Sequence, residues 1–469
     1  MRKSDQTSRR SFLISAAAAS AAAGVVPLAG RASAGFGAND KVRIATVGMG
    51  IIGFIDTDCA LKVPGVELVA VADLYEGRRV HAKEVYGDRV ETLVDYRRIL
   101  DRKDVDAVLL CVPDHWHARM SVDAMRAGKA VYCEKPMVRT VEEGPEVIKV
   151  QQETKSVFQV GSQFASSVVF DKLKQVLDSG AIGKLHSVEA RYNRNSALGA
   201  WQYSIPTDAS PKTVDFDRFL GGAPKIVFNA DHFFRWRKYW AYGTAVAGDL
   251  FVHLLTAIHH ATGALGPTRV AAMGGRRYWN DGREVYDLIM GLLDYPETDK
   301  HPAFTLALQT DFEDGGGDNS LFRFVGSDGV IDVTFNGLKV TRVGIEQATT
   351  EQILKGYNSV TTFSRAGQAA FAARLREEKK APRAEEKEAE SFAAPKGYDA
   401  RLDHFTKFFA SIREGKPVEE DATFGYRAAA PALLCNDSYR QGRMIAWDPV
   451  AMRFPVESGN ITSGVLRPR

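Results

Sequence analysis

The sequence predicts an α/β protein with two main domains: a first domain built on a parallel sheet, and a second, α+β domain with an open, mostly antiparallel sheet. In the first part of the chain, apolar strands alternate with helical segments, a pattern typical of parallel strands joined by crossover helices. From about residue 185, short strands follow one another with turn-forming residues between them, which favours antiparallel pairing. The 469 residues, of which 45% are hydrophobic and 25% charged, are enough to build two hydrophobic cores.

A leader of 34 residues precedes the predicted fold. The paired residues Arg9 and Arg10 come before an alanine-rich apolar run, and the small residues at 32–34 are typical of a cleavage site. We therefore predict a twin-arginine signal peptide over residues 1–34, which would direct the protein through the twin-arginine export machinery to the periplasm or another exported location. The apolar run at 12–28 is short and weakly apolar for a membrane span, so we expect no stable membrane insertion.

The formal net charge of +3 arises from this leader, in which five residues are basic and one is acidic. The remainder of the chain is close to neutral, which argues against nucleic acid as a partner. Four cysteines lack the spacing of metal ligands, and we expect them to be buried free thiols; they are Cys59, Cys111, Cys133 and Cys435. The other possible ligands also lack metal-site spacing, so we expect no metal.

A glycine-rich turn follows the first strand of the first domain, which we place at residues 35–160. The strand covers residues 41–47, and the turn reads Gly48-Met49-Gly50-Ile51-Ile52-Gly53 before a helix begins. In such a turn the first glycine permits the tight bend, the second lets the backbone approach a pyrophosphate, and the third lets helix and strand pack. The turn predicts a Rossmann dinucleotide-binding domain whose cofactor contacts include Gly48, Gly50, Ile51, Ile52 and Gly53.

An acidic residue, Asp73, ends the second predicted strand, 20 residues after Gly53. At this spacing a carboxylate can accept hydrogen bonds from the adenosine ribose, and it would repel a 2′-phosphate. We therefore expect NAD as the cofactor, with NADP less favoured. Arg78 and Arg79 weaken this preference, because a nearby arginine can reach a phosphate. The alternative role of Asp73 is that of a helix N-cap.

Further candidate cofactor contacts follow two later strands, predicted at residues 107–112 and 130–133. They are Pro113, Asp114 and His117 after the first strand, and Glu134 and Lys135 after the second. In an open parallel sheet, ligands lie at the carboxyl ends of the strands. Lys135 follows an apolar strand and precedes a proline that restricts its backbone, so we expect its side chain near the nicotinamide.

The second domain, placed at residues 161–364, is expected to bind the substrate. We expect its strands at residues 185–192, 269–274, 286–295, 304–312, 321–326 and 329–333. Residues 365–396 are rich in Ala, Glu, Lys and Arg and are predicted to be a charged helical or flexible insertion. The remaining residues, 397–469, are predicted to form C-terminal helices at about 398–412 and 426–441 and a tail that pack on the body of the protein.

The segment "GTAVAGDLFVHLLTAIHH" brings an acid and an imidazole together. In a helix, Asp249 and His253 stand at i and i+4 and share one face. An acid beside an imidazole can orient the ring and raise its basicity, as a general base requires. Taken alone, the pattern favours a helix-start carboxylate with a structural histidine. His259 and His260 lie outside the pattern and are expected to be structural or exposed.

Aromatic residues interleaved with arginines flank this segment. Such residues suit the mixed apolar and polar surface of a sugar, although core packing explains some of them equally well. The candidate substrate contacts are Trp201, Trp236, Tyr239 and Trp240.

After the leader, nearly the whole chain resembles the Gfo/Idh/MocA oxidoreductases, a family that includes glucose–fructose oxidoreductases and inositol dehydrogenases. The resemblance rests on "VGMGIIG", "DAVLLCVPDHWHARMSVDAMRAGKAVYCEKP", "SGAIGKLHSVEARY" and "FGYRAAAPALLCNDSYRQGRMIAWD", of which the second is highly specific. It implies that Lys135 is the catalytic lysine and forms a catalytic group with Asp249 and His253. The chain departs from the family at Asp114, where Asn is usual, and at Phe251, where glycine is frequent.

The same resemblance implies that Glu134 and Pro113 shape the nicotinamide end, and that His117 fills a histidine position of the family. It also implies an NAD-dependent oxidoreductase that acts by hydride transfer on a secondary hydroxyl of a sugar, sugar derivative or cyclitol, with either His253 or Lys135 taking the proton. A homo-oligomer is possible.

An exported protein could not replace NADH once released, so we expect its cofactor to stay bound and to be regenerated in place. A second substrate or an epimerisation would achieve this. So would the cycle of an NAD-dependent glycosidase, in which transient oxidation permits elimination of the leaving group before re-reduction. A non-catalytic, cofactor-bound sugar-binding protein is the alternative from another class.

Overall fold

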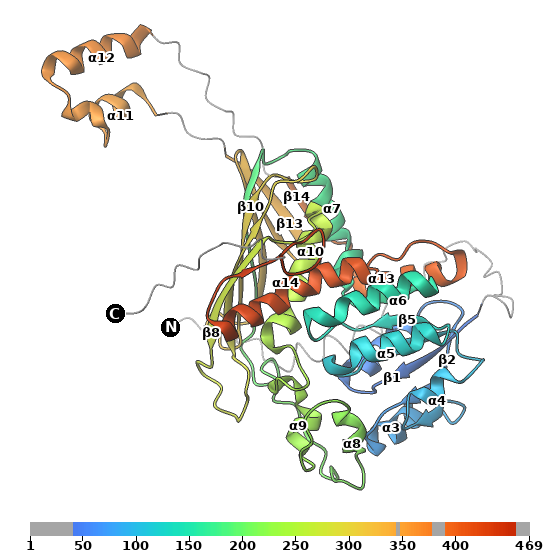
Figure 1. Ribbon diagram of the computed structural model, residues 1–469. Helices are drawn as coiled ribbons and strands as arrows, with labels where there is room; N and C mark the ends of the chain where they lie inside the picture. The colour runs from blue at the N-terminus through green and yellow to red at the C-terminus, as the bar shows by residue number, and fades with distance from the viewer. Residues whose placement is uncertain (1–40, 344–347, 378–389, 456–469) are drawn as a thin grey trace, which may run out of the picture. The chain divides into compact units, whose positions relative to one another are not determined.

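The computed structural model describes residues 41–343, 348–377 and 390–455, and the predicted signal peptide lies outside them. The described chain contains a six-stranded parallel sheet followed by a nine-stranded, mostly antiparallel sheet (Figure 1). This arrangement confirms the predicted fold class of a Rossmann domain followed by an α+β domain with an open sheet.

The six-stranded sheet has the order β3-β2-β1-β4-β5-β6. Its strands are β1 (Val42–Val47), β2 (Val66–Ala72), β3 (Glu91–Leu93), β4 (Ala107–Leu110), β5 (Ala130–Cys133) and β6 (Phe158–Val160). Val47, the last residue of β1, pairs with Ala72 on one side and Leu110 on the other, so three strands end level with one another. The strand order reverses between β1 and β4, and open α/β sheets bind ligands at the carboxyl edge of such a reversal.

Helices from two distant parts of the chain cover this sheet. Those of the first domain are α2 (Ile51–Leu61), α3 (Glu76–Tyr86), α4 (Arg97–Leu100), α5 (Asp114–Arg126) and α6 (Gly144–Thr154). A further helix, α13 (Ala400–Glu414), comes from the C-terminal region and contacts α2. Its Phe405, Phe408 and Phe409 are fully buried, and Phe405 stacks on Tyr132 of β5 with 4.3 Å between ring centroids. The core of the first domain is therefore completed by residues near the end of the chain.

The nine-stranded sheet has the order β14-β13-β12-β11-β7-β10-β9-β8-β15, and only β7 and β10 pair in parallel. Its strands are β7 (Leu185–Asn193), β8 (Arg269–Gly275), β9 (Leu288–Tyr295), β10 (Phe304–Asp311), β11 (Asn319–Gly326), β12 (Gly329–Thr334), β13 (Gly337–Arg342), β14 (Glu390–Ala393) and β15 (Ile445–Ala446). Burial alternates along β8 and β9, as expected of an antiparallel sheet with one covered face.

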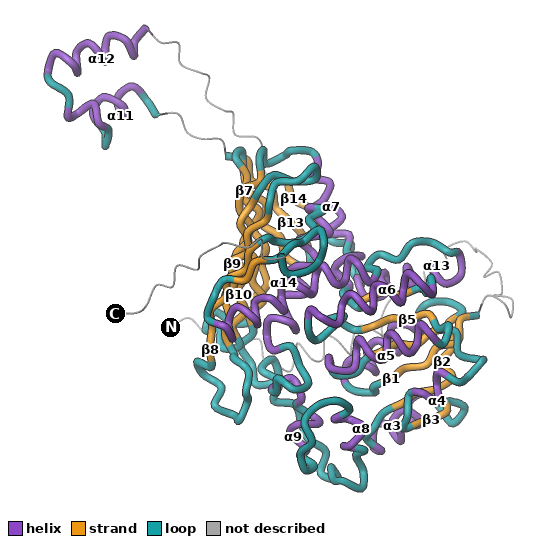
Figure 2. The backbone as a smooth tube through the Cα atoms, in the orientation of Figure 1, coloured by secondary structure: helices purple, strands orange, loops and turns teal. Residues whose placement is uncertain are grey.

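Three helices cover the buried face of this sheet (Figure 2): α7 (Val168–Asp178), α10 (Val252–Thr262) and α14 (Ala422–Gln441). The opposite face exposes apolar side chains, including Met273, which is 82% exposed, and Leu292, which is 59% exposed. Because α14 also contacts α6 of the first domain, the two sheets are joined by a packed helical layer.

The shorter elements include a strand within the predicted insertion. Residues 365–396 contain α12 (Arg365–Glu377), a helix without buried residues, but also β14, which pairs with β13 at the edge of the large sheet. The remaining short helices are α8 (Phe216–Leu220), α9 (Ala230–Phe234) and α11 (Thr350–Lys355), with turns η2 (Val141–Glu143), η3 (Gln163–Ser166), η4 (Trp236–Lys238), η5 (Ala247–Phe251) and η6 (Ser359–Thr362).

All four cysteines are buried free thiols, which confirms that prediction. Within the described ranges, none of the helices has the length and apolar character that crossing a membrane requires.

Candidate active site

A cavity of about 830 Å³ opens at the carboxyl ends of the parallel strands. Residues of both domains line it: Gly48, Asp73 and Lys135 come from the first domain, and Asp249 and His253 come from the second. The dinucleotide motif and the predicted catalytic residues therefore face one continuous space.

The glycine-rich turn has the shape of a dinucleotide cradle. Gly48 adopts φ +89°, and a Cβ built on it would overlap the carbonyl oxygen of Cys111. A Cβ at Gly53 would overlap the carbonyl oxygen of Gly48, so this glycine lets α2 pack on the turn. Gly50, Ile51 and Ile52 line the cavity at the N-terminus of α2, where no described side chain caps the helix by a hydrogen bond. These features fit a pyrophosphate bound to backbone N–H groups.

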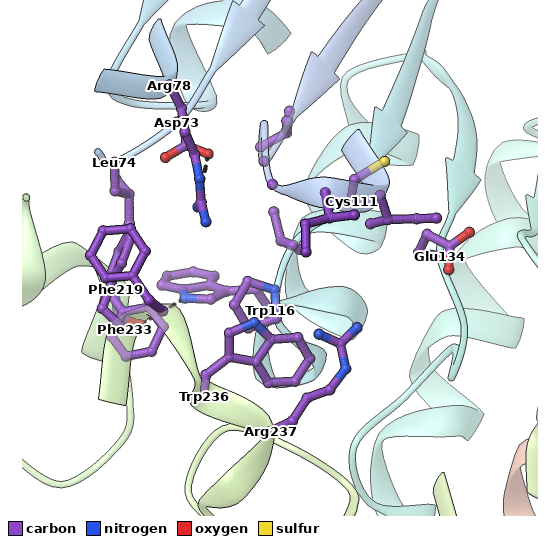
Figure 3. Close-up of a pocket in the computed structure, with 18 of the residues that line it drawn as sticks. Asp73, Leu74, Arg78, Cys111, Trp116, Glu134, Phe219, Phe233, Trp236 and Arg237 are labelled. Atoms are coloured by element: carbon purple, nitrogen blue, oxygen red, sulfur yellow. Dashed lines mark hydrogen bonds and ion pairs between the residues drawn. The ribbon is translucent and has the colours of Figure 1, made fainter. Parts of the chain in front are cut away.

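Asp73 is buried at the end of β2 and lines the cavity beside this turn. Its carboxylate accepts hydrogen bonds from the backbone N–H of Met49 at 2.7 Å and of Tyr75 at 2.8 Å. Arg78 lies 3.5 Å from the same carboxylate, and Figure 3 shows its guanidinium directed into the cavity. Arg79 instead donates to the backbone carbonyl of Asp73 at 2.7 Å and does not line the cavity, so of these two arginines Arg78 is the one that shares the cavity with Asp73.

Lys135 and Asp249 form an ion pair across the two domains. Lys135 Nζ donates to Asp249 Oδ1 at 2.7 Å and to the backbone carbonyl of Asp249 at 3.1 Å. Arg237 Nε donates to the same Oδ1 at 3.4 Å. Burial alone would raise the pKa of Asp249, but the charges of Lys135 and Arg237 outweigh it and hold that pKa well below its usual range.

The predicted contact between Asp249 and His253 is corrected by the structure. Asp249 lies in a π-helical turn, η5, immediately before α10. This wider turn changes the α-helical spacing on which the expectation of a shared face relied. Throughout the described residues, the hydrogen bonds of the Asp249 carboxylate go to Lys135 and Arg237, and none joins it to His253.

His253 lines the cavity with its ring packed between aromatic side chains. Its ring centroid lies 5.3 Å from that of Phe164 and 6.2 Å from that of Tyr192. Its Nδ1 is buried without a hydrogen-bond partner among the described residues. Burial, followed by the nearby charge of Lys135, lowers the pKa of His253 well below its usual value, so the imidazole is neutral at neutral pH and can accept a proton.

Three of the predicted contacts after β4 and β5 line the cavity, and two do not. Pro113, Glu134 and Lys135 line it. Asp114 is buried at the start of α5, where its carboxylate accepts a hydrogen bond from Thr244 Oγ1 at 2.7 Å. Both ring nitrogens of His117 lie near carbonyl oxygens, 2.6 Å from that of Pro136 and 2.8 Å from that of Val112. Asp114 and His117 therefore hold the loops around the cavity instead of facing it.

Among the four predicted substrate aromatics, only Trp236 lines the cavity. Trp201 is fully buried, with its ring 4.9 Å from Phe312 in an edge-on contact, so it is a core residue. Tyr239 is buried, and Trp240 packs against Tyr286. Phe251 is also fully buried outside the cavity wall. The alternation of aromatic and basic residues does not distinguish core from cavity positions, because residues 194–242 form loops and short helices without a regular period.

A segment of the second domain, residues 203–237, covers the adenosine end of the cavity, which the sequence did not predict. Asp215 N donates to the carbonyl of Leu74 at 3.0 Å, and Trp116 Nε1 donates to that of Phe219 at 3.0 Å. The cavity wall here is aromatic (Figure 3), formed by Trp116, Phe219, Phe233, Phe234 and Trp236.

The proximity of two buried carboxyl groups, those of Asp56 and Glu134, was also not predicted from the sequence. Asp56 of α2 forms an ion pair with Arg401 of α13 and accepts a weak hydrogen bond from Cys111 Sγ at 3.6 Å. Burial, reinforced by Asp56, raises the pKa of Glu134 to about 8. The position of Asp56 inside the apolar run "IIGFIDTDCAL" was the available signal in the sequence. Its ion-pair partner, Arg401, lies more than 300 residues away and could not be identified from the sequence.

Two family models match the chain in succession. Residues 42–162 match the oxidoreductase family with an NAD-binding Rossmann fold, and residues 170–332 match the GFO/IDH/MocA C-terminal domain.

The curated relatives include inositol 2-dehydrogenases. That of Salmonella typhimurium is 33% identical over 167 residues, which are 35% of this chain and 49% of the relative. That of Rhizobium meliloti is 32% identical over 194 residues, which are 40% of this chain and 58% of the relative. The chain thus spans about half the length of the curated relatives it matches.

Solved structures share the fold over most of the chain. A levoglucosan dehydrogenase in complex with NADH and levoglucosan has 17% identity and a TM-score of 0.61, covering 87% of this chain and 99% of that one. An oxidoreductase from Thermotoga maritima has 17% identity and a TM-score of 0.61, covering 88% and 99%. Together with the glycine-rich turn and the cavity, the two family models show that the chain belongs to the Gfo/Idh/MocA oxidoreductase family and carries its NAD-binding Rossmann domain.

Proposed function

We propose that this protein is an NAD-dependent oxidoreductase that acts on a secondary hydroxyl of a sugar, sugar derivative or cyclitol. The observation that carries the proposal is the Lys135–Asp249 ion pair, which lies with His253 in the same cavity as the dinucleotide cradle. The names of the relatives, inositol 2-dehydrogenase and levoglucosan dehydrogenase, support a cyclitol or sugar as the substrate class.

The mechanism divides two tasks between His253 and Lys135. NAD supplies a hydride acceptor in its oxidised form and a hydride donor in its reduced form. His253, neutral because it is buried, accepts the proton of the substrate hydroxyl. Lys135 uses two of the three ammonium N–H groups on Asp249, so one remains to donate to the substrate oxygen as negative charge develops there.

Asp249 holds Lys135 in place for this task. Its carboxylate and its backbone carbonyl both accept from Nζ, which fixes the ammonium at the cavity wall. The role of Asp249 is thus to position the lysine, whereas the sequence pattern suggested that it positions the histidine.

We also propose that the protein is exported and keeps its cofactor. The twin-arginine motif in the leader supports export. The segment over the adenosine end of the cavity supports slow cofactor release, because it adds the aromatic rings of Phe219 and Phe233 to the cavity wall. A captive cofactor favours a redox-neutral cycle, whether between two substrates, by epimerisation, or as in an NAD-dependent glycosidase.

The first experiment is to purify the mature protein, denature it and quantify the released NAD(H) per chain. We expect close to one NAD(H) per chain. Incubation of the intact protein with inositols, free sugars and glycosides should then change the absorbance of the reduced cofactor. Protein that is isolated empty and binds NAD only weakly would refute the captive cofactor. An unchanged redox state together with no conversion of any of the compounds would instead favour a non-catalytic sugar-binding protein.

A further inference from the structure

Arg194 is a cavity-lining cation without a carboxylate partner among the described residues. It directly follows β7, and its Nη1 donates to the backbone carbonyl of Gly199 at 3.0 Å. Its guanidinium carbon lies 5.6 Å from the ring centroid of Tyr192, which itself lies beside His253. Arg194 is also close enough to lower the pKa of both Asp249 and His253. It therefore lies at the catalytic end of the cavity.

Four other arginines that line the cavity are each paired with an acid. These pairs are Arg78 with Asp73 at 3.5 Å, Arg97 with Asp95 at 3.2 Å, Arg218 with Asp215, and Arg401 with Asp56. The two exceptions are Arg194, which has no such partner in the described parts of the chain, and Arg237, which shares Asp249 with Lys135. Both exceptions come from the second domain.

The catalytic end of the cavity consequently has an excess of positive charge. Lys135, Arg194 and Arg237 line it beside the carboxylate of Asp249, whereas burial raises the pKa of Glu134 to about 8, so that this carboxyl group is protonated at neutral pH, and His253 is neutral. Arg237 leaves both terminal nitrogens without a hydrogen bond to the described residues, and it lies over the Trp236 ring at 4.2 Å. Guanidinium groups whose terminal N–H donors are not engaged by a carboxylate favour, in a partly buried site, a ligand with an anionic group, because each presents a planar fork of N–H donors.

The pyrophosphate of the dinucleotide does not account for these two arginines. It is expected at the N-terminus of α2, and the arginine nearest to that turn is Arg78, whose guanidinium lies about 3.8 Å from a Cβ built on Gly50. Arg194 and Arg237 belong instead to the side of the cavity that holds Asp249 and His253.

We infer that the substrate is an anionic sugar, whose carboxylate or phosphate is bound by Arg194 and Arg237. This inference rests on the proposed function, because it places the anion next to the residues that receive the hydroxyl proton. Arg194 and Arg237 then determine specificity for charged over neutral sugars, while Lys135 and His253 act at the reacting hydroxyl.

The test is a binding measurement on the protein as purified with its cofactor, because binding does not depend on turnover. Isothermal titration calorimetry would compare D-glucuronate and D-galacturonate with D-glucose and D-galactose, and would include glucose 6-phosphate and galactose 6-phosphate as phosphate probes. The variants are Arg194→Gln, Arg237→Gln and, as a matched control, Arg323→Gln. Arg323 lies on β11, beside β7, in an exposed ion pair with Asp332.

We expect anionic probes to bind at least about 10-fold more tightly than their neutral counterparts, and the preference to fall as ionic strength rises. Arg194→Gln and Arg237→Gln should each remove most of this preference, and Arg323→Gln should retain it. Tighter binding of the uronates assigns the anion as a carboxylate, and tighter binding of the sugar phosphates assigns it as a phosphate.

Equal binding of neutral and anionic sugars, or the absence of binding by every anionic probe, would overturn the inference. So would a preference that survives in both variants with unchanged melting temperatures. Reduction of bound NAD by a neutral sugar or cyclitol in the same preparation would show that the proposed function holds while the inference fails. If the purified protein holds no NAD(H) and no added compound is oxidised or reduced, both the proposed function and this inference are refuted.

Discussion

Lys135 Nζ lies 2.7 Å from Asp249 Oδ1, so that one ion pair connects the two domains at the cavity. Lys135 follows β5 of the parallel sheet, and Asp249 belongs to the π-helical turn before α10. The two side chains come from different domains, and their distance therefore depends on how the domains pack. A lysine held in this way has a fixed position only when both domains are folded.

Asp249→Asn should reduce turnover strongly. The amide keeps the size of the side chain but removes the charge that holds the Lys135 ammonium. We expect kcat to fall by about 100-fold or more, on the scale of other positioned proton-transfer groups, whereas KM changes little. NAD(H) content per chain should stay constant. The control is Asp294→Asn, which breaks an exposed pair with Arg269 and should leave kcat unchanged. Equal kcat in both variants would contradict the role of Asp249.

Asp73→Asn should weaken NAD binding and reduce discrimination against NADP. The carboxylate accepts hydrogen bonds from Met49 and Tyr75 and is also available to the ribose hydroxyls. We expect NAD affinity to fall about 10-fold, consistent with the ~1.5–3 kcal/mol of a charged hydrogen bond. Calorimetric titration of cofactor-free protein with NAD and with NADP measures the ratio. Asp104→Asn, in an exposed pair with Arg102, is the control; an unchanged ratio in Asp73→Asn would refute the ribose role.

Gly48→Ala should be far more destabilising than Gly128→Ala. Both glycines have positive φ, +89° and +73°, so both substitutions carry the backbone cost of about 1–2 kcal/mol. Only Gly48 adds a clash, with the carbonyl of Cys111, because nothing lies within 4 Å of a Cβ at Gly128. Thermal unfolding measures the stability of each variant, and titration with NAD measures the affinity of the glycine-rich turn for the cofactor. We expect loss of NAD binding in Gly48→Ala alone, and equal effects in both variants would contradict the close approach.

Glu134 should make stability depend on pH. Its pKa is raised to about 8 in the folded chain, chiefly by burial, whereas an unfolded glutamate has a pKa of about 4.3. The folded chain therefore keeps a proton that the unfolded chain releases, so this contribution is fully present below about pH 4.3 and is lost as pH rises through about 8. Glu134→Gln cannot ionise and should show a smaller decline.

Melting temperatures between about pH 5 and pH 9 test this prediction, because the window spans most of the difference between the two pKa values. The difference in unfolding free energy between Glu134→Gln and the parent protein should grow with pH in favour of the variant, by on the order of 1 kcal/mol or more. Glu153→Gln, which removes an exposed carboxylate paired with Lys149 on α6, is the control. Parallel pH profiles in all three proteins would contradict a protonated Glu134.

The sequence predicts best what depends on neighbouring residues. The turn from Gly48 to Gly53, Asp73 after β2 and Lys135 after β5 are placed by local patterns, and all three line or support the cavity. The partner of Asp249 was not predictable from spacing, because η5 is a π-helical turn and the nearest cation comes from the other domain. Trp201 was predicted as a sugar contact because it is an aromatic residue in a segment that also contains arginines. In the structure it adopts φ +66° and packs in the core.

Contacts between distant segments explain the remaining differences. Arg401 lines the cavity and pairs with Asp56 only because α13 packs on α2. Likewise, residues 203–237 reach the first domain through loops and the short helix α8, whose Phe219 carbonyl accepts a hydrogen bond from Trp116, and such irregular segments give no periodic signal. The site is therefore predictable at the strand ends and at Asp249 and His253, whereas the loops and short helices that the second domain adds to the wall are not.

The packing of α13 on the first domain also sets an order of events during synthesis. The ribosome must translate through Phe409 before the aromatic side chains that complete this core exist, and through Arg401 before the cavity wall is whole. A chain truncated near residue 395 would leave an apolar face of the parallel sheet open to water. The nascent chain can thus reach its dinucleotide-binding form only after α13 has been translated, even though every residue of the glycine-rich turn emerges first.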